Sequence, residues 1–70
     1  MNKIKINDIY LHYKGNEYQV LNIARHTENN KKLVIYRSLK NNKIWARPYD
    51  MFIENIKVDN KIIQRFKLIK

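Results

Sequence analysis

Short runs of β-branched and aromatic residues alternate with turn-forming residues along the whole chain, and no stretch shows a sustained helical period. Runs of this kind predict short strands, and they lie at residues 9–13, 17–27, 33–39, 44–47, 54–58 and 62–69. Five or six antiparallel strands in 70 residues are typical of a mostly β domain. We expect a small SH3-like barrel or roll. An OB-like barrel is the alternative, although it usually needs a longer chain and a helix.

The length of the chain and its turn residues predict one domain. We expect residues 1–8 to form a flexible lead or an edge strand, and residues 9–70 to form the single small β-barrel domain. Gly15, the only glycine, follows the first apolar run and indicates a hairpin turn, because glycine takes positive φ without steric cost. Pro48 has no N–H for a ladder, so the fourth strand ends there and one short helical turn is expected near 49–52.

The basic balance of the chain favours an anionic partner. The net charge is +9, from 15 Lys and Arg against 6 Asp and Glu. Clustered Lys and Arg favour nucleic acid, because they replace the counterions condensed on phosphates. Lys, Asn and Ile are also abundant, and their A/T-rich codons would spread Lys over any surface. That bias works against Arg, so the four Arg are the more informative charges: Arg25, Arg37, Arg47 and Arg65.

Several function classes find no support in the residues. With no Cys there is no disulfide, thiolate nucleophile or Cys-ligated zinc, which fits a reducing, intracellular setting. The start lacks the apolar run of a signal peptide and no window would span a bilayer, so we expect a cytoplasmic protein without a membrane partner. His12 and His26 fall in different strands, so no metal site and no cofactor are predicted. No carboxylate pair, activated nucleophile or Gly-rich phosphate loop is present, so we predict no enzyme activity.

The stretch from Leu33 to Phe52 holds the only Trp, the only Pro and two of the four Arg. We predict its faces from a register in which Arg25 pairs near Ile35 and Tyr36 near Arg47. The core face would carry Leu21, Ile23, Leu33, Ile35, Ile44 and Ala46, with Arg25 and Arg37 at its open end. The other face, the candidate site, would carry Ala24, His26, Tyr36, Ser38, Trp45 and Arg47. A one-residue bulge would move half of these residues across the sheet.

The residue types in this stretch suit a planar, anionic ligand. Arg presents a fork of donors to phosphate or carboxylate, and Trp and Tyr offer flat surfaces for stacking. Nucleobases combine both properties, and stacking on an aromatic side chain contributes about 1–3 kcal/mol per base. The predicted ligand-binding residues are Arg25, His26, Tyr36, Arg37, Trp45 and Arg47. The competing interpretation is that Trp45 and Tyr36 pack in the core and that Arg47 makes a cation–π contact or a salt bridge.

The order of several short motifs resembles a family of small bacterial proteins. The chain reads His12-Tyr13-Lys14-Gly15, then Ala24-Arg25-His26-Thr27-Glu28, Val34-Ile35-Tyr36-Arg37, Trp45-Ala46-Arg47-Pro48, Met51-Phe52 and Arg65-Phe66. In order and spacing, over about residues 10–66, this is similar to the Domain of Unknown Function 1653 family. One departure is Asn60, where the family often has Gly; Asn tolerates positive φ, so the turn is expected to survive.

The resemblance implies a mostly β domain of SH3-like character and brings no established activity. It draws attention to ten positions that match the family's pattern. Six of them are the ligand-binding residues predicted above. The other four are secondary site residues: His12, Tyr13, Lys14 and Arg65. Polar and aromatic residues at so many of these positions favour a shared binding pocket, although buried Arg side chains that hold turns together would leave the same pattern.

Three functional hypotheses follow. The first is a non-catalytic binding module for nucleic acid or a nucleotide-like small molecule. The second is a protein-interaction module for an acidic or extended peptide, since small SH3-like barrels bind such peptides in aromatic grooves. The third is a structural accessory subunit that pairs through an exposed edge strand. We expect a monomer or a weak homodimer in each case.

Overall fold

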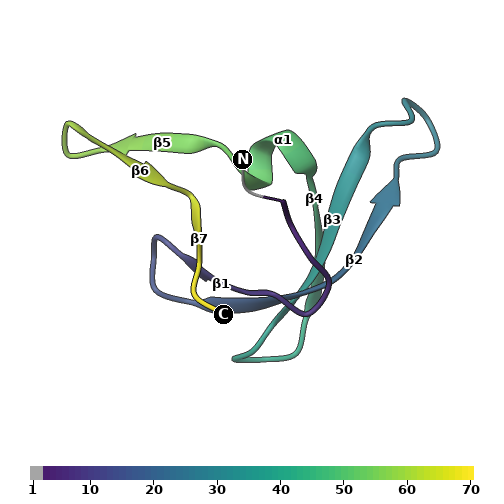
Figure 1. The fold of residues 1–70 in the computed structure, drawn as a ribbon, viewed down its shortest axis with the longest axis horizontal. Helices are drawn as coiled ribbons and strands as arrows, with labels where there is room; N and C mark the ends of the chain where they lie inside the picture. The colour runs from purple at the N-terminus through teal and green to yellow at the C-terminus, as the bar shows by residue number, and fades with distance from the viewer. Residues whose placement is uncertain (1–2) are drawn as a thin grey trace.

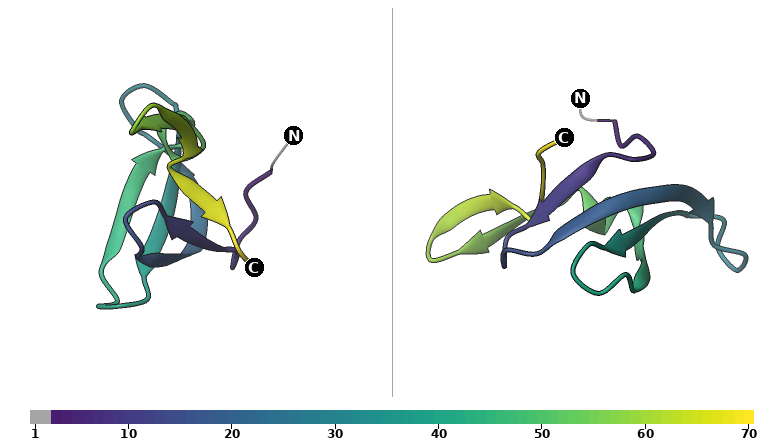
Figure 2. Two further views of the ribbon diagram at one scale, coloured as in Figure 1. Left: turned by 90° about the vertical axis from the view of Figure 1, so that its left-hand side faces the viewer. Right: turned by 90° about the horizontal axis from the view of Figure 1, so that it is seen from below.

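A five-stranded antiparallel sheet forms the body of the molecule, and a two-stranded hairpin projects from it (Figure 1). The computed structural model describes residues 3–70. The elements in chain order are β1 (Ile9–His12), β2 (Glu17–Arg25), β3 (Lys32–Ser38), β4 (Ile44–Pro48), α1 (Tyr49–Phe52), β5 (Asn55–Val58), β6 (Lys61–Gln64) and β7 (Phe66–Leu68). The large sheet has the order β4-β3-β2-β1-β7, and β5 pairs only with β6 within the described residues. The β5–β6 hairpin and the tip of the β2–β3 hairpin lie at opposite ends of the molecule (Figure 2).

The mostly β fold and the helical turn at residues 49–52 are confirmed. The strand number is not: residues 3–70 contain seven strands instead of five or six, and the two sheets do not close into a barrel. The difference arises at Arg65, where the single last strand predicted for residues 62–69 breaks. β6 before the break pairs with β5, whereas β7 after it pairs with β1. The backbone N–H of Tyr13 donates to the Arg65 carbonyl at 3.0 Å, which fixes the corner against β1.

Two tight turns use residues with positive φ, as the sequence predicts. Gly15 has φ of 103° in the turn between β1 and β2, where its N–H donates to the His12 carbonyl at 2.7 Å. Asp59 and Asn60 have φ of 52° and 65° between β5 and β6. Positive φ at both central residues is typical of a two-residue hairpin turn. Asn60 therefore adopts the left-handed conformation for which the family pattern often has Gly.

A β-bulge at Leu21 sets which residues of β2 share a face with β3. Before the bulge Val20 pairs with Tyr36, and after it Ile23 pairs with Val34. The predicted pairing of Arg25 near Ile35 is wrong, because Arg25 pairs with Lys32. The extra residue turns Ala24 and His26 away from the face of Tyr36, and brings Ile23 and Arg25 onto it.

The predicted assignment of the core face is also wrong. Val34, Tyr36 and Ser38 are buried, whereas Ile44 on the opposite face is 63% exposed. β3 is apolar on both faces, so alternation alone does not identify the core side. The concave side becomes the core because α1 and β7 cover it with Phe52 and Phe66.

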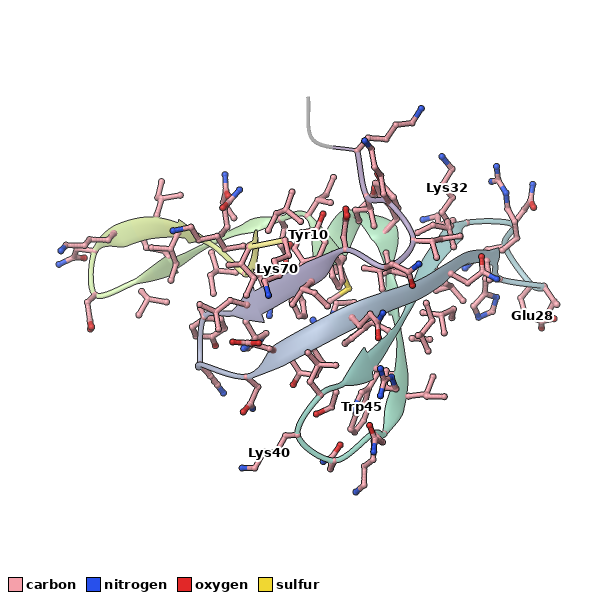
Figure 3. All side chains as sticks on the ribbon, turned by 60° about the horizontal axis from the view of Figure 1, so that its bottom comes forward. Tyr10, Glu28, Lys32, Lys40, Trp45 and Lys70 are labelled. Atoms are coloured by element: carbon pink, nitrogen blue, oxygen red, sulfur yellow. The ribbon has the colours of Figure 1, made fainter. Side chains whose placement is uncertain are left out.

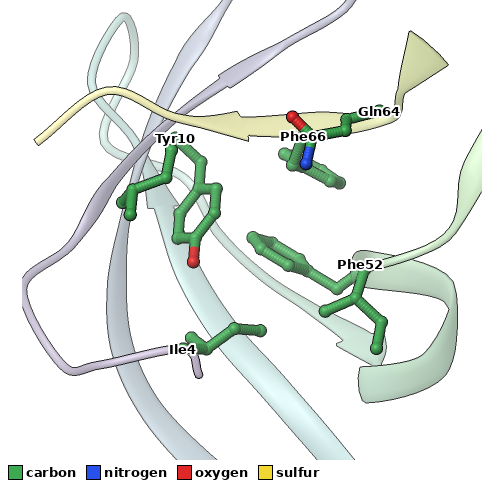
Figure 4. A pocket seen from close by; sticks show the side chains of 7 residues that line it. Ile4, Tyr10, Phe52, Gln64 and Phe66 are labelled. Carbon is green, nitrogen blue, oxygen red and sulfur yellow. The ribbon is translucent and has the colours of Figure 1, made fainter. Parts of the chain in front are cut away.

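The core is a cluster of aromatic rings on the concave side of the large sheet. Phe52 stacks on Phe66 with centroids 4.1 Å apart and planes 6° from parallel. Tyr10 meets Phe52 edge to face at 5.1 Å, and these three side chains point toward one another in Figure 4. Tyr36 meets both Phe rings edge to face, at 5.4 and 5.6 Å. A cavity of only about 40 Å³ remains beside the rings, so the cluster fills this part of the concave side.

Residues 3–8 of the expected lead form no strand, and they pack against the domain. Ile4 is buried beside Tyr10 and Phe52 (Figure 4). The N–H of Asn7 donates to the Val20 carbonyl at 2.8 Å, and the N–H of Val20 donates to the Asp8 carbonyl at 2.9 Å. Residues 1 and 2 lie outside the described residues.

Candidate functional site

An open hollow lies on the concave side of the sheet, next to the outer strand β4. It has a volume of about 180 Å³, and its lining is three aromatic rings and one guanidinium: Tyr18, Tyr36, Trp45 and Arg47. We call these four residues the aromatic hollow. Tyr36 and Trp45 are direct cross-strand partners, so they share a face. Their environments differ greatly, since Tyr36 is 5% exposed and Trp45 is 49% exposed.

Arg47 is fixed at the floor of the aromatic hollow by two contacts. Its Nε donates to the Tyr36 hydroxyl at 3.3 Å, and its Cζ lies 5.5 Å from the centroid of the Phe66 ring. The cation–π interpretation of Arg47 is therefore confirmed, and Tyr36 is a core residue. Among the described residues the two Nη groups of Arg47 make no hydrogen bond or salt bridge. Their N–H donors remain available to an anion.

His12 lies beside the aromatic hollow, on the same aromatic cluster. Its ring is 4.9 Å from Phe66 and 6.3 Å from Tyr18, edge to face in both cases. Its Nδ1 accepts the Lys14 backbone N–H at 3.2 Å, which leaves Nε2 to carry the ring proton of the neutral form. Burial lowers the pKa of His12, and the charges of Arg47, Arg65 and Lys14 lower it further.

Arg65 combines a structural and an electrostatic role. Its Nη2 donates to Glu54 Oε1 at 2.6 Å, and this bond joins the residue before β5 to the residue after β6. Its Nε is buried without a hydrogen-bond partner among the described residues. Because Glu54 already neutralises Arg65, Arg47 is the Arg with the less compensated charge near the hollow. Glu54 pairs with Arg65, so it does not supply the salt bridge that was the alternative role for Arg47.

Three of the predicted ligand-binding residues do not reach the aromatic hollow. Arg25 lies near the tip of the β2–β3 hairpin, where its Nη1 donates to the Asn30 carbonyl at 2.9 Å. His26 lies in the adjoining loop, and its Nδ1 accepts the Glu28 N–H at 3.1 Å. Arg37 points to the opposite face of β3, as its ladder position requires, and its Nη groups donate to Asn42 Oδ1 and to Gln19.

The remaining secondary residues border the site without lining it. Tyr13 and Lys14 lie in the turn after β1, with the Lys14 Nζ 5.7 Å from the Tyr13 centroid, and the Tyr13 ring is 4.6 Å from the ring of His12. The residue that sequence reasoning missed is Tyr18, whose ring lies 5.3 Å from that of Tyr36. Tyr18 lies two residues before Val20, so by strand alternation both side chains lie on the same face, and Val20 pairs with Tyr36. That spacing is the signal that would have found it.

Other kinds of site find no support within residues 3–70. No three His, Asp or Glu side chains come close enough to hold a metal ion. No helix in that range has the length and apolar character needed to cross a bilayer. No Asp or Glu of the described residues lines the aromatic hollow, and the carboxylate of Glu54 is engaged by Arg65.

Comparison with known proteins identifies the family. The model of the family described as "Protein of unknown function (DUF1653)" matches residues 8–68. The chain belongs to this family. A crystal structure of a DUF1653 protein from Bordetella bronchiseptica is similar, with a TM-score of 0.83 and 24% sequence identity, and the match covers 96% of this chain and 88% of that one. That likeness supports the fold. No curated protein matches the chain.

Proposed function

We propose that this DUF1653 domain is a non-catalytic binding module that takes nucleic acid or a nucleotide-like anionic ligand at the aromatic hollow. A planar ring of the ligand stacks on Trp45, and its phosphate accepts hydrogen bonds from the Nη groups of Arg47. The observation that carries the proposal is the pairing of a half-exposed Trp with an Arg whose Nη donors are unused. Planar rings and phosphates are what these two groups bind best.

The size of the aromatic hollow supports recognition of one ring at a time. Pockets that enclose a whole small molecule usually measure about 300–1,000 Å³. The hollow measures about 180 Å³ and is open to solvent along β4. One nucleobase therefore fits the proposal better than an enclosed metabolite. The net charge of +9 supports the same partner, because it attracts a polyanion.

The only Trp of the chain lies in the hollow, so its fluorescence reports directly on the site. The experiment is a titration with thymidine monophosphate and with oligothymidylates at two salt concentrations. We expect quenching on binding, with affinity that falls as salt rises. Arg47→Gln should weaken binding about fivefold or more, whereas Arg37→Gln, the same change on the opposite face, should leave it unchanged. Equal affinity of the Arg47 variant and the wild type would refute the proposal.

A protein partner is the second candidate, and one observation favours it. β4 is an outer strand of the large sheet, and its Ile44 is 63% exposed. An extended, acidic peptide would add a strand to this edge and place a side chain in the hollow. Quenching of Trp45 by such a peptide, together with no response to oligonucleotides, would favour this candidate over the first.

A further inference from the structure

A second hollow lies farther along the β3–β4 hairpin, at the end away from the β3–β4 turn. It has a volume of about 450 Å³ and is lined by Arg25, Asn30, Lys31, Lys32, Pro48, Tyr49 and Asp50. We call it the basic hollow, because three cationic side chains face one carboxylate there. Figure 3 shows Lys32 at this end and Trp45 at the other. None of its cations forms a salt bridge with Asp50 among the described residues.

The β-ladder places the two hollows on one line. Trp45 of the aromatic hollow and Pro48 of the basic hollow belong to the same strand, three residues apart. At about 3.3 Å per residue, their backbones are separated by about 10 Å. Arg47 lies between them. Arg25 pairs with Lys32, and by strand alternation both share the face of Val34 and Tyr36.

We propose that the two hollows are the ends of one binding track for single-stranded nucleic acid. This inference rests on the proposed function and names its ligand class. A base stacks in the aromatic hollow, the adjoining phosphate binds Arg47, and the following phosphates bind Arg25, Lys31 and Lys32. The track runs along β4, past Pro48 and Tyr49.

The separation of the two hollows decides between a mononucleotide and a strand. A base stacked on Trp45 lies about 10 Å along the backbone from Pro48 of the basic hollow, which is a longer span than one nucleotide step. Phosphates of one strand in a duplex follow each other at about 3.4 Å along the axis, so about three to four nucleotides cover this distance. OB folds that bind single strands occupy about 4–16 nucleotides each, which is the same range.

Packing and one hydrogen bond orient the cationic side chains of the basic hollow, and other N–H donors on them remain unpaired among the described residues. The Lys32 Nζ lies 5.5 Å from the Tyr49 ring centroid, which orients the ammonium group and leaves its N–H donors free for an anion. The Arg25 Nη1 is bonded to the Asn30 carbonyl, and the rest of its guanidinium makes no hydrogen bond among the described residues. Asp50 is the only carboxylate in the lining, and its negative charge repels a phosphate. Removing that charge should therefore strengthen binding, whereas removing a Lys charge should weaken it.

The test is a length series of oligothymidylates, from one to eight nucleotides, titrated against the full chain with Trp45 fluorescence as the readout. We expect affinity to rise steeply between about two and five nucleotides. Lys32→Gln should weaken binding of the eight-nucleotide strand about fivefold and reduce the slope of log affinity against log salt by about 0.7, the value of one phosphate contact on a single strand. Asp50→Asn should strengthen binding.

Controls separate this inference from the proposed function. Lys57→Gln removes the same charge from β5, away from both hollows, and should leave the salt slope within error of the wild type. Binding that is sensitive to Arg47 but independent of length, with Lys32→Gln equal to Lys57→Gln, would overturn the track and leave the aromatic hollow as a site for single nucleotides. Equal affinity for a duplex of the same length would also overturn the track. No quenching by any of the oligonucleotides would refute the proposed function itself.

Discussion

Phe52 is the side chain through which α1 is joined to the concave face, so Phe52→Ala is the sharpest test of the core. Phe52 is 1% exposed and is the only buried residue of α1. It stacks on Phe66 and meets Tyr10 and Tyr36 edge to face. Removing the ring therefore leaves a cavity bounded by three other rings, and none of them is free to fill it without losing its own contacts.

The expected loss is large relative to the stability of so small a domain. Burial of a Phe side chain contributes about 1.5–3 kcal/mol, and the cavity left by Phe→Ala raises the total cost to about 3–5 kcal/mol. At about 0.05–0.15 kcal/mol per residue, a chain of 70 residues has a free energy of unfolding of about 3.5–10 kcal/mol. Phe52→Ala should consequently lose between about a third and all of the free energy of unfolding, whereas Phe52→Leu should stay folded with a smaller loss.

The assay is urea denaturation followed by circular dichroism, with Met51→Ala as the matched control. Met51 precedes Phe52 in the same helical turn and is 43% exposed, so its truncation should cost less than about 1 kcal/mol. A loss below about 1 kcal/mol for Phe52→Ala, or equal losses for the two variants, would refute the packing of α1 described above.

Three further predictions test the turns, the corner and the pH dependence of stability. Gly15→Ala should lower the free energy of unfolding by about 1–2 kcal/mol in urea denaturation, because φ is 103°; no atom lies within 4 Å of the added Cβ, so a steric clash would not account for the loss. Glu54→Gln should cost about 1 kcal/mol by the same measurement, since it weakens a partly exposed pair with Arg65; an unchanged midpoint would remove that pair from the corner. The lowered pKa of His12 means that the unfolded state takes up a proton first as pH falls below about 6.5, so stability should decline from there down through the folded-state pKa, and His12→Asn should flatten that decline in melting curves between pH 7 and 5.

The sequence predicted the elements well where local chemistry decides them. The strands before Pro48, the helical turn after it and the turns at Gly15 and Asn60 follow from residue types that act over two to four positions. The break at Arg65 could not be predicted in this way. It depends on β1 and β5, two segments far apart in the chain, which pair with opposite sides of the corner.

The candidate site was predicted in part for the same reason. Tyr36, Trp45 and Arg47 come together because β3 and β4 pair without a bulge, so their shared face follows from alternation. Arg25 and His26 were assigned by the same rule across β2, where the bulge at Leu21 changes the parity. No residue type marks that bulge in the sequence, so the positions beyond it were assigned to the wrong face relative to Tyr36.

In this small domain the candidate site is continuous with the core. Core and candidate site were expected on opposite faces, but one aromatic surface carries both, and exposure rises along it from Phe52 and Tyr36 to the half-exposed Trp45. Arg47 lies at the edge of the buried rings: it contacts the Phe66 ring and the Tyr36 hydroxyl, and its two Nη groups have no partners among the described residues. Packing therefore holds the orientation of the guanidinium in the free protein, which would lower the entropic cost of binding the proposed ligand. A ligand that stacks on Trp45 would extend the core outward by one ring, so the proposed site would need no helix or loop of its own.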